Sequence, residues 1–293
     1  MMSSSFPPST PSLGGIGPGS QPMEEDGGEL EYMEMPSEMT TYAMPDIPEP
    51  ENLVGLDDAK RIMCEIKAAL DAYKVGEKTI IIDLAGLDDE NQALVNQVLG
   101  EGEVSALGDG GSIQAQESVL AGVWRVRTGN EEGTVIKDIV EIADFPTSVL
   151  DYTFDKAAPA PQPVPDVLPE GVLNAAPLVV ELEDALKEYQ PGDLAHVINL
   201  TLLPQTDEDI TFMGKQLGFG NTTILSRGYG NCRVSSTATK NVWWVQFFNS
   251  QDAIILNTIE VTNIPNVTCA AQEDVDDSAY RLGEIIEVYI DHE

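Results

Sequence analysis

A short stretch at residues 226–237, SRGYGNCRVSST, gathers the most chemically versatile side chains of the chain. In a protein with few basic residues, it contains Arg227, Tyr229, Asn231, Cys232 and Arg233. Such a set suits a nucleophile loop, a metal site, a binding loop, or simply a turn that leads into a strand.

Catalysis by Cys232 needs a general base within hydrogen-bond reach, most often a histidine. The chain has two histidines, and His292 lies at its extreme C-terminus, so His196 is the one candidate base. The alternative is a structural cysteine buried in a strand. We favour that alternative, because the matching position earlier in the chain is Ile113 and a free cysteine packs as a small apolar residue.

Metal and phosphate sites have less support. Cys64, Cys232 and Cys269 are far apart in the sequence, whereas zinc sites use Cys and His at close spacing. The acidic runs LDDEN and EDVDD lack the glycine and the terminal glutamate of a calcium loop. The motifs LGEG, GDGG, LGFG and GYG follow predicted helices and precede strands, so caps and tight turns explain them. We predict no catalytic residue, no metal and no cofactor, and we expect that the protein is not an enzyme.

The charge balance narrows the class of partner. The 293 residues include 15 Lys+Arg and 50 Asp+Glu, which give a net charge of −35. This charge disfavours nucleic acid, whose binding needs neutralisation of phosphates, and it attracts basic protein segments. No stretch approaches the roughly 18 apolar residues of a membrane span. The N-terminus has no basic region followed by an apolar run, and three unpaired cysteines fit a reducing compartment, so we expect a cytoplasmic protein.

Residues 1–50 differ from the rest of the chain. The first part is rich in Ser, Pro and Gly, the second is acidic and rich in Met, and no Lys or Arg precedes Lys60. We expect a disordered tail, because this composition buries too little apolar surface to offset the entropy of ordering. Methionines adapt to irregular apolar surfaces, so segment 33–48 is a candidate docking segment. Its candidate contact residues are Met35, Met39, Tyr42 and Pro45.

The body divides at a Pro/Ala-rich stretch, residues 156–171, which we interpret as a semi-extended linker. The flanking parts, 51–155 and 172–293, resemble each other. ALDAYKVGEKTIIIDL (69–84) parallels ALKEYQPGDLAHVINLTL (185–202), LGEG (99–102) parallels LGFG (217–220), and Trp124 falls on Trp243. We infer an internal duplication.

Each unit carries the same predicted elements. A helix at 57–73 or 177–189 precedes a strand, a second helix ends at Leu99 or Leu217, and β-rich runs with hairpin turns follow. The C-terminal residues have the spacing of a further helix. The predicted fold class is α+β, with two tandem duplicated units that each have an antiparallel sheet backed by helices, and a disordered acidic N-terminal tail.

The two units diverge where a recognition surface could lie. Arg227, Tyr229, Asn231 and Arg233 stand where the first unit has Gly108, Gly110, Ser112 and Gln114. Duplicated units often keep the scaffold and diverge at a site, although pairing of the arginines with local carboxylates is the simpler explanation. We add Trp243 to these candidate partner-contacting residues.

The same residues carry a family resemblance. The stretch RGYGNCRVSST…NVWWVQFFNSQDAIILNTIEV resembles the C-terminal region of the HupH/HyaF hydrogenase expression proteins, which occurs in duplicate in that family. EMTTYAMPDIPEP (38–50) and LGEGEVSA…QESVLAGVWRVR resemble its N-terminal segment and first repeat. The likeness covers about residues 33–290.

The resemblance implies a cytoplasmic accessory protein for the maturation of NiFe uptake hydrogenases. It implies a chaperone that holds the small-subunit precursor, with its twin-arginine signal peptide, until assembly and export. The alternatives are a scaffold that gathers maturation factors without gripping the signal peptide, an enzyme that uses Cys232, and a carrier of metal or clusters that uses the three cysteines.

Overall fold

The computed structural model describes residues 55–130, 132–228 and 230–290. It is an α+β protein, and within these residues it has six α-helices and ten strands. In the first half these are α1 (Asp57–Ala72), β1 (Ile80–Asp83), α2 (Asp89–Leu99), β2 (Val104–Gly108), β3 (Ile113–Glu117), β4 (Val123–Gly129), β5 (Val135–Ile142) and α3 (Thr147–Thr153). In the second half they are α4 (Ala175–Glu188), β6 (His196–Asn199), α5 (Asp207–Leu217), β7 (Thr223–Ser226), β8 (Asn231–Ser236), β9 (Val242–Phe248), β10 (Ile254–Val261) and α6 (Gln272–Ile290).

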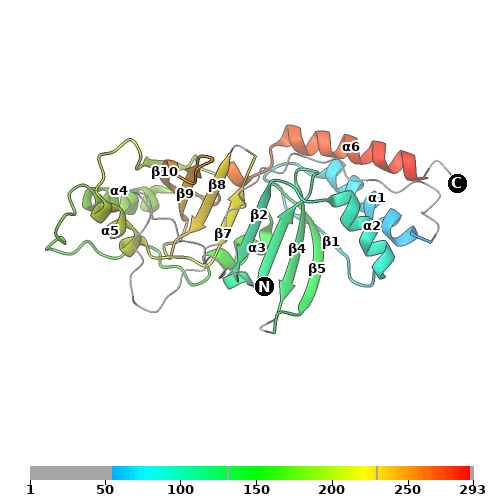
Figure 1. Ribbon diagram of the computed structural model, residues 1–293, viewed down its shortest axis with the longest axis horizontal. Helices are drawn as coiled ribbons and strands as arrows, with labels where there is room; N and C mark the ends of the chain where they lie inside the picture. The colour runs from blue at the N-terminus through cyan, green and yellow to red at the C-terminus, as the bar shows by residue number, and fades with distance from the viewer. Residues whose placement is uncertain (1–54, 131, 229, 291–293) are drawn as a thin grey trace, which may run out of the picture.

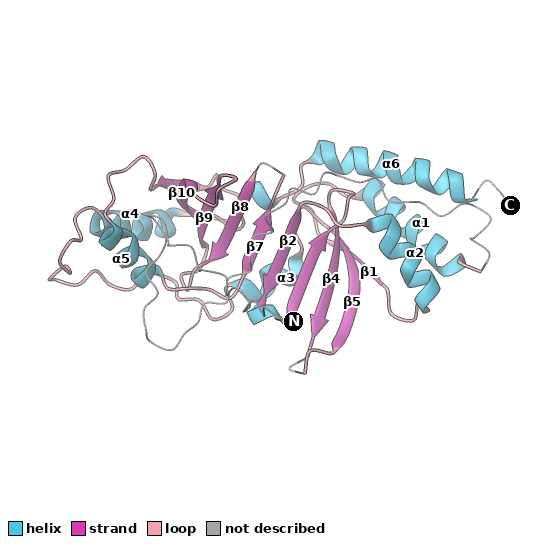
Figure 2. Ribbon diagram, viewed as in Figure 1, coloured by secondary structure: helices cyan, strands magenta, loops and turns pink. Residues whose placement is uncertain are grey.

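All ten strands form one antiparallel sheet in the order β1-β5-β4-β3-β2-β7-β8-β9-β10-β6. Each half contributes five neighbouring strands, and the halves meet where β2 pairs with β7, with Val104 opposite Ser226 and Leu107 opposite Thr223. Figure 2 shows the strands as a band that runs between the helices at the two ends. Unpaired edge strands invite aggregation, so this pairing removes one exposed edge from each half. The expectation of a separate sheet in each unit is therefore corrected to a single shared sheet.

The two faces of the sheet are covered differently. Val123 and Ile142 face a core with α1 and α2, and Val242 and Ile259 face a core with α4 and α5. The side chains that alternate with these, including those of Trp124 and Trp243, form a central core on the opposite face with α3 and residues 264–269. Figure 1 shows α1, α2 and α6 at one end of the molecule and α4 and α5 at the other.

The C-terminal helix α6 packs against the first half although it follows the second half in sequence. Val275, Ala279 and Leu282 belong to the core that contains α1. Gln272 Oε1 accepts from the Val75 amide at 2.9 Å, and Gly122 leaves the room that the Val275 side chain occupies. The last helix of the fold is thus held against the first half by apolar packing and a hydrogen bond.

The two Leu-Gly-x-Gly motifs have the same structural role in both halves. Gly100 and Gly218 end α2 and α5 with φ of 54° and 66°, in the left-handed region that favours glycine. The next glycines, Gly102 and Gly220, lie so close to the neighbouring strand that a Cβ would fall 2.2 Å from Ser118 O or from Ser236 Oγ. The predicted role as caps and close turns is confirmed, and no phosphate-binding function is needed.

Most predicted elements are confirmed within one to three residues, including the C-terminal helix. The short helix α3 was not predicted, because its seven residues are too few for a clear apolar period. Stretch 156–171 contains no helix or strand, only an isolated bridge between Ala158 and Thr239, and the Val164 side chain packs against the second helical core.

Candidate functional site

The first candidate surface lies where β7 ends and β8 begins. The Arg227 amide donates to Glu103 O at 3.1 Å, so the pairing of β7 with the first half continues one residue beyond the strand. Arg227 is exposed and Asn231 is half-buried. Tyr229 lies outside the described residues, as do Met35, Met39, Tyr42 and Pro45 of the candidate docking segment.

Arg233 is held more firmly than a flexible surface arginine. It lies on β8, half-buried, and its guanidinium carbon is 5.1 Å from the ring centre of Phe248. Such stacking over an aromatic ring stabilises the cation and restricts its rotamers. On β8, Asn231 and Arg233 share a face of the strand and Cys232 points to the other.

Trp243 cannot contact a partner in this fold, so that prediction is corrected. Its side chain is fully buried, and its indole N–H donates to Asn263 O at 3.2 Å. Trp124 at the matching place in the first half is equally buried and donates to Ala143 O at 3.0 Å. A large apolar body with one polar atom to satisfy suits a core position, so both tryptophans serve packing.

The structure argues against catalysis by a Cys232–His196 pair. Cys232 is fully buried in the central core, and burial raises the pKa of its thiol to about 12. His196 lies on β6 opposite Val261, which faces the helical core, and its Nε2 is 2.9 Å from Glu181 Oε1 of α4. The two side chains therefore lie on opposite faces of the sheet.

The cysteines do not form a metal-binding group either. Cys64 is exposed on α1, whereas Cys232 and Cys269 belong to the central core. Across the described part of the chain, no three Cys, His, Asp or Glu side chains come together as metal ligands.

A groove that the sequence did not suggest lies between α4 and the edge strand β6. It is a shallow depression of about 460 Å³ that is largely open to solvent. Its lining residues are Pro177, Val180, Glu181, Asp184, Ala185, Glu188 and His196. The three carboxylates fall on one side of α4 because residues three or four apart are neighbours on a helix. The groove thus combines an apolar lining with an acidic flank.

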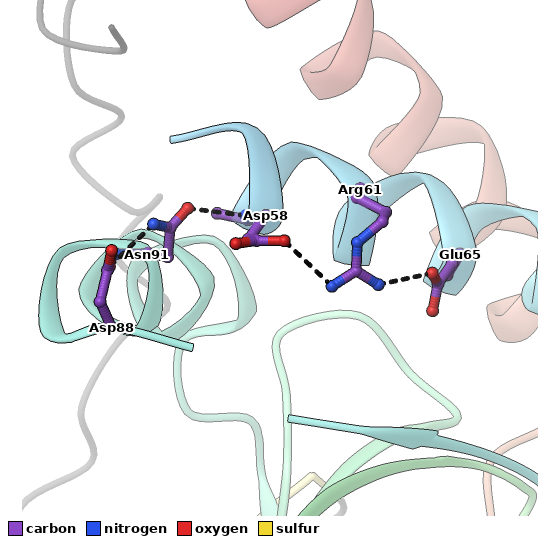
Figure 3. A network of polar contacts seen from close by, with 6 residues as sticks. Asp58, Arg61, Glu65, Asp88 and Asn91 are labelled. Atoms are coloured by element: carbon purple, nitrogen blue, oxygen red, sulfur yellow. Dashed lines mark hydrogen bonds and ion pairs between the residues drawn. The ribbon is translucent and has the colours of Figure 1, made fainter. Parts of the chain in front are cut away.

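The positions of α1 that match the groove lining carry no net charge, and their arginine is paired. The alignment of 69–84 with 185–202 places Arg61, Glu65 and Ala68 where α4 has Pro177, Glu181 and Asp184. Arg61 donates to Glu65 Oε1 at 2.8 Å and to Asp58 Oδ1 at 3.2 Å, as Figure 3 shows. On α4 a proline stands in place of the arginine, so Glu181 lacks the arginine partner that Glu65 has on α1.

The start of each of these helices is also held differently. In the first half the Asn91 side chain accepts from the Ala59 amide at 2.9 Å and is itself held by Asp88 (Figure 3). In the second half Asp209, fully buried, accepts from three successive amides, those of residues 173–175, at 2.8–2.9 Å. Burial opposes ionisation of Asp209, but a hydrogen bond from the Thr206 amide together with these three outweighs it and lowers the pKa of the carboxyl group.

Comparison with known proteins places this architecture in a family. The model of the HupH hydrogenase expression protein, C-terminal conserved region, matches the chain at residues 56–161 and again at 172–289. The chain belongs to the HupH family of hydrogenase expression proteins. The two matched stretches coincide with the two halves of the sheet, one on each side of the Pro/Ala-rich stretch.

Relatives in this family match over nearly their whole length. The hydrogenase expression/formation protein HupQ of Azotobacter chroococcum mcd 1 is 47% identical over 276 residues, which cover 93% of this chain and 95% of that protein. HupH of Rhodobacter capsulatus is 45% identical over 274 residues, again covering 93% and 95%. The hydrogenase-1 operon protein HyaF of Escherichia coli K12 is 28% identical over 275 residues, covering 92% and 94%.

Among solved structures, the hydrogenase expression protein HupH from Thiobacillus denitrificans matches with 29% identity and a TM-score of 0.34. It covers 38% of this chain and 93% of that chain. Within the described residues of the present structure, no helix has both the length and the apolar character that crossing a membrane requires.

Proposed function

We propose that this protein is a cytoplasmic accessory factor in hydrogenase maturation, and that it acts as a chaperone for the precursor of the NiFe hydrogenase small subunit. The observation that carries the proposal is the match of nearly the whole chain to hydrogenase expression/formation proteins at up to 47% identity. A non-catalytic role agrees with the buried Cys232 and its separation from His196.

The electrostatics favour a client with a basic segment. A twin-arginine leader is basic near its start and apolar afterwards, and a chain with a net charge of −35 attracts it over a distance. We propose segment 33–48, with Met35, Met39, Tyr42 and Pro45, as one client contact. The region of Arg227, Tyr229, Asn231 and Arg233 is proposed as another.

We also propose that the two halves arose by duplication of one α+β unit. The matched order of elements and the two matches of one family model support this origin. Duplication lets one copy keep the fold while the other diverges at a binding surface.

Co-purification with an affinity-tagged small-subunit precursor tests the chaperone role. We expect the full chain to be captured, and capture to fall when residues 1–50 are removed. Undiminished capture by the truncated protein would show that residues 1–50 do not contribute to client binding, and no capture of the full chain would contradict the chaperone proposal.

The second candidate is a scaffold that gathers maturation factors. The acidic surface would serve that role as well, because it attracts any basic partner. The isolated leader peptide separates the two functions: the chaperone binds the leader, whereas a scaffold of this kind binds other maturation proteins and leaves the leader free.

A further inference from the structure

The side of α4 that lines the groove is long enough to lie along a short peptide. The stretch of α4 from Pro177 to Glu188 spans about 16 Å at 1.5 Å per residue. An extended chain of about five residues has the same length. The Val180 side chain, half of it exposed, contributes apolar surface beside the groove's carboxylates.

The charge of the groove selects its occupant. Glu181, Asp184 and Glu188 give it three carboxylates, and among the described residues no Lys or Arg lines it. His196 pairs with Glu181, and Lys187 pairs with Asp184 at 2.8 Å, on the exposed surface of α4. Exposed pairs of this kind exchange readily, because each contributes little free energy.

The acidic segments of the chain itself fit this groove poorly. Residues 1–50 contain no Lys or Arg and many carboxylates, so they meet like charge there. Helix α6 of a second copy carries Glu273, Asp274, Asp276 and Asp277 in its first turns and is equally disfavoured.

Divergence between the halves points to the same surface. On the matching face of α1, Arg61 and Glu65 cancel, and Ala68 and Ala72 stand where α4 has acids. At the positions that line the groove, α4 is more negative than α1 by three charges, because Pro177 stands in place of Arg61 and two acids stand in place of alanines. Support of the fold alone does not require this difference in charge, since both helices bury their opposite faces in similar cores.

We propose that the α4–β6 groove binds a segment of a partner protein that carries at least two basic side chains next to apolar ones. The basic groups pair with Glu181, Asp184 and Glu188, and the apolar ones pack on Pro177, Val180 and Ala185. The groove is thus the surface on which the proposed chaperone would hold its client. Only the identity of the partner, the small-subunit precursor, rests on the proposed function.

Fluorescence anisotropy with a labelled peptide tests the groove on the full chain. The probe is a synthetic 16-residue peptide with two adjacent arginines followed by leucine, alanine and valine. We expect Glu181→Gln/Glu188→Gln to raise the Kd about tenfold, because the variant loses two ion pairs with the arginines of the peptide. The matched control, Asp58→Asn/Glu65→Gln, removes the same two charges from α1 and should leave the Kd within about twofold.

A charge swap separates specific pairing from bulk attraction. Glu181→Lys/Glu188→Lys should bind a second probe in which both arginines are glutamates, and the wild-type protein should not. Equal weakening by the α4 and α1 double variants would overturn the proposal, as would failure of the swapped pair to bind.

The peptide assay tests the groove, whereas precursor capture tests the chaperone function. If the groove variants behave as expected with the peptide, the groove proposal stands even when the small-subunit precursor is not captured, and that second result counts against the chaperone function alone. Circular dichroism of each variant verifies that it is folded, and the gain of binding by the swapped pair excludes unfolding as the cause.

Discussion

The two halves of the sheet share a backbone plan and differ in the polar groups placed on it. In the first half Arg125 and Asp138 form a largely buried ion pair at 2.6 Å on the helical face. In the second half Trp244 and Asn257 occupy the corresponding strand positions, and the indole N–H donates to the amide oxygen at 2.5 Å. Positions that satisfy the backbone or fill the core are kept, whereas charges on the helical face are free to change.

The largest loss of stability is expected at the buried tryptophans, which test whether the two halves are packed alike. Trp124→Ala and Trp243→Ala should each lower the free energy of unfolding by about 4 kcal/mol, since each leaves a large cavity and an unpaired backbone carbonyl. Urea denaturation followed by circular dichroism measures the loss. A loss below about 1 kcal/mol at Trp243 would mean that the second half does not share the packing of the first.

The next largest effect concerns the pH dependence of stability, which we expect to arise at Glu117 and not at Ser236, its counterpart in the second half. Burial, with the charges of Glu103 and Asp274, raises the pKa of Glu117 to about 7 from an ordinary value of 4.5. The fold therefore prefers the protonated carboxyl, so this contribution to stability is complete below about pH 4.5 and is lost as the pH rises through 7.

Glu117→Gln should remove this dependence and be more stable than the wild-type protein at pH 8, by on the order of 3 kcal/mol. Urea midpoints at pH 5 and pH 8 provide the measurement, with Ser236→Ala as the control that changes no charge. The same pH slope in both the wild-type protein and Glu117→Gln would refute the assignment.

A smaller difference is expected at the starts of α1 and α4. Asp209→Ala leaves three amides of the α4 start without their acceptor and should cost at least about 2 kcal/mol, whereas Asn91→Ala leaves one and should cost about 1 kcal/mol. The lowered pKa of Asp209 means that its contribution is present above the ordinary aspartate pKa and is lost in acid. Equal losses for the two variants at pH 7 would contradict the contrast.

The smallest expected effect concerns the thiols. Cys64 on α1 is exposed, whereas burial raises the pKa of Cys232 and of Cys269 to about 12. A thiol reagent at pH 7.5 should therefore label one cysteine in the native protein and three after unfolding. Cys64→Ser should abolish native labelling and change stability by less than about 0.5 kcal/mol. Fast native labelling of a second thiol would show that the central core opens.

Local sequence patterns predicted the elements because each pattern has a local physical cause. Asp88 and Thr206 begin α2 and α5 by accepting amides at N3, and glycines with positive φ end both helices. Matching Cys232 with Ile113 placed the cysteine in the core, and the structure confirms that placement. Trp243 is as deeply buried as Trp124, on which it falls, and its predicted partner contact was wrong.

The features that the sequence did not reveal depend on contacts between distant residues. Nothing local to Val104 or Ser226 says that β2 and β7 pair with each other, and the apolar spacing of α6 does not say which half it covers. The groove was missed for a similar reason: Glu181, Asp184 and Glu188 look like an ordinary solvated face until His196 and the edge of the sheet are placed beside them.

Capture of the small-subunit precursor by matched variants is the sharpest test of client binding at the α4–β6 groove. Tagged precursor is incubated with equal concentrations of wild-type protein, Glu181→Gln/Glu188→Gln, and the α1 control Asp58→Asn/Glu65→Gln. We expect the α4 variant to be captured about tenfold less efficiently and the α1 control to be captured like the wild-type protein. Equal capture of all three would contradict the claim that the second half holds the client through this groove.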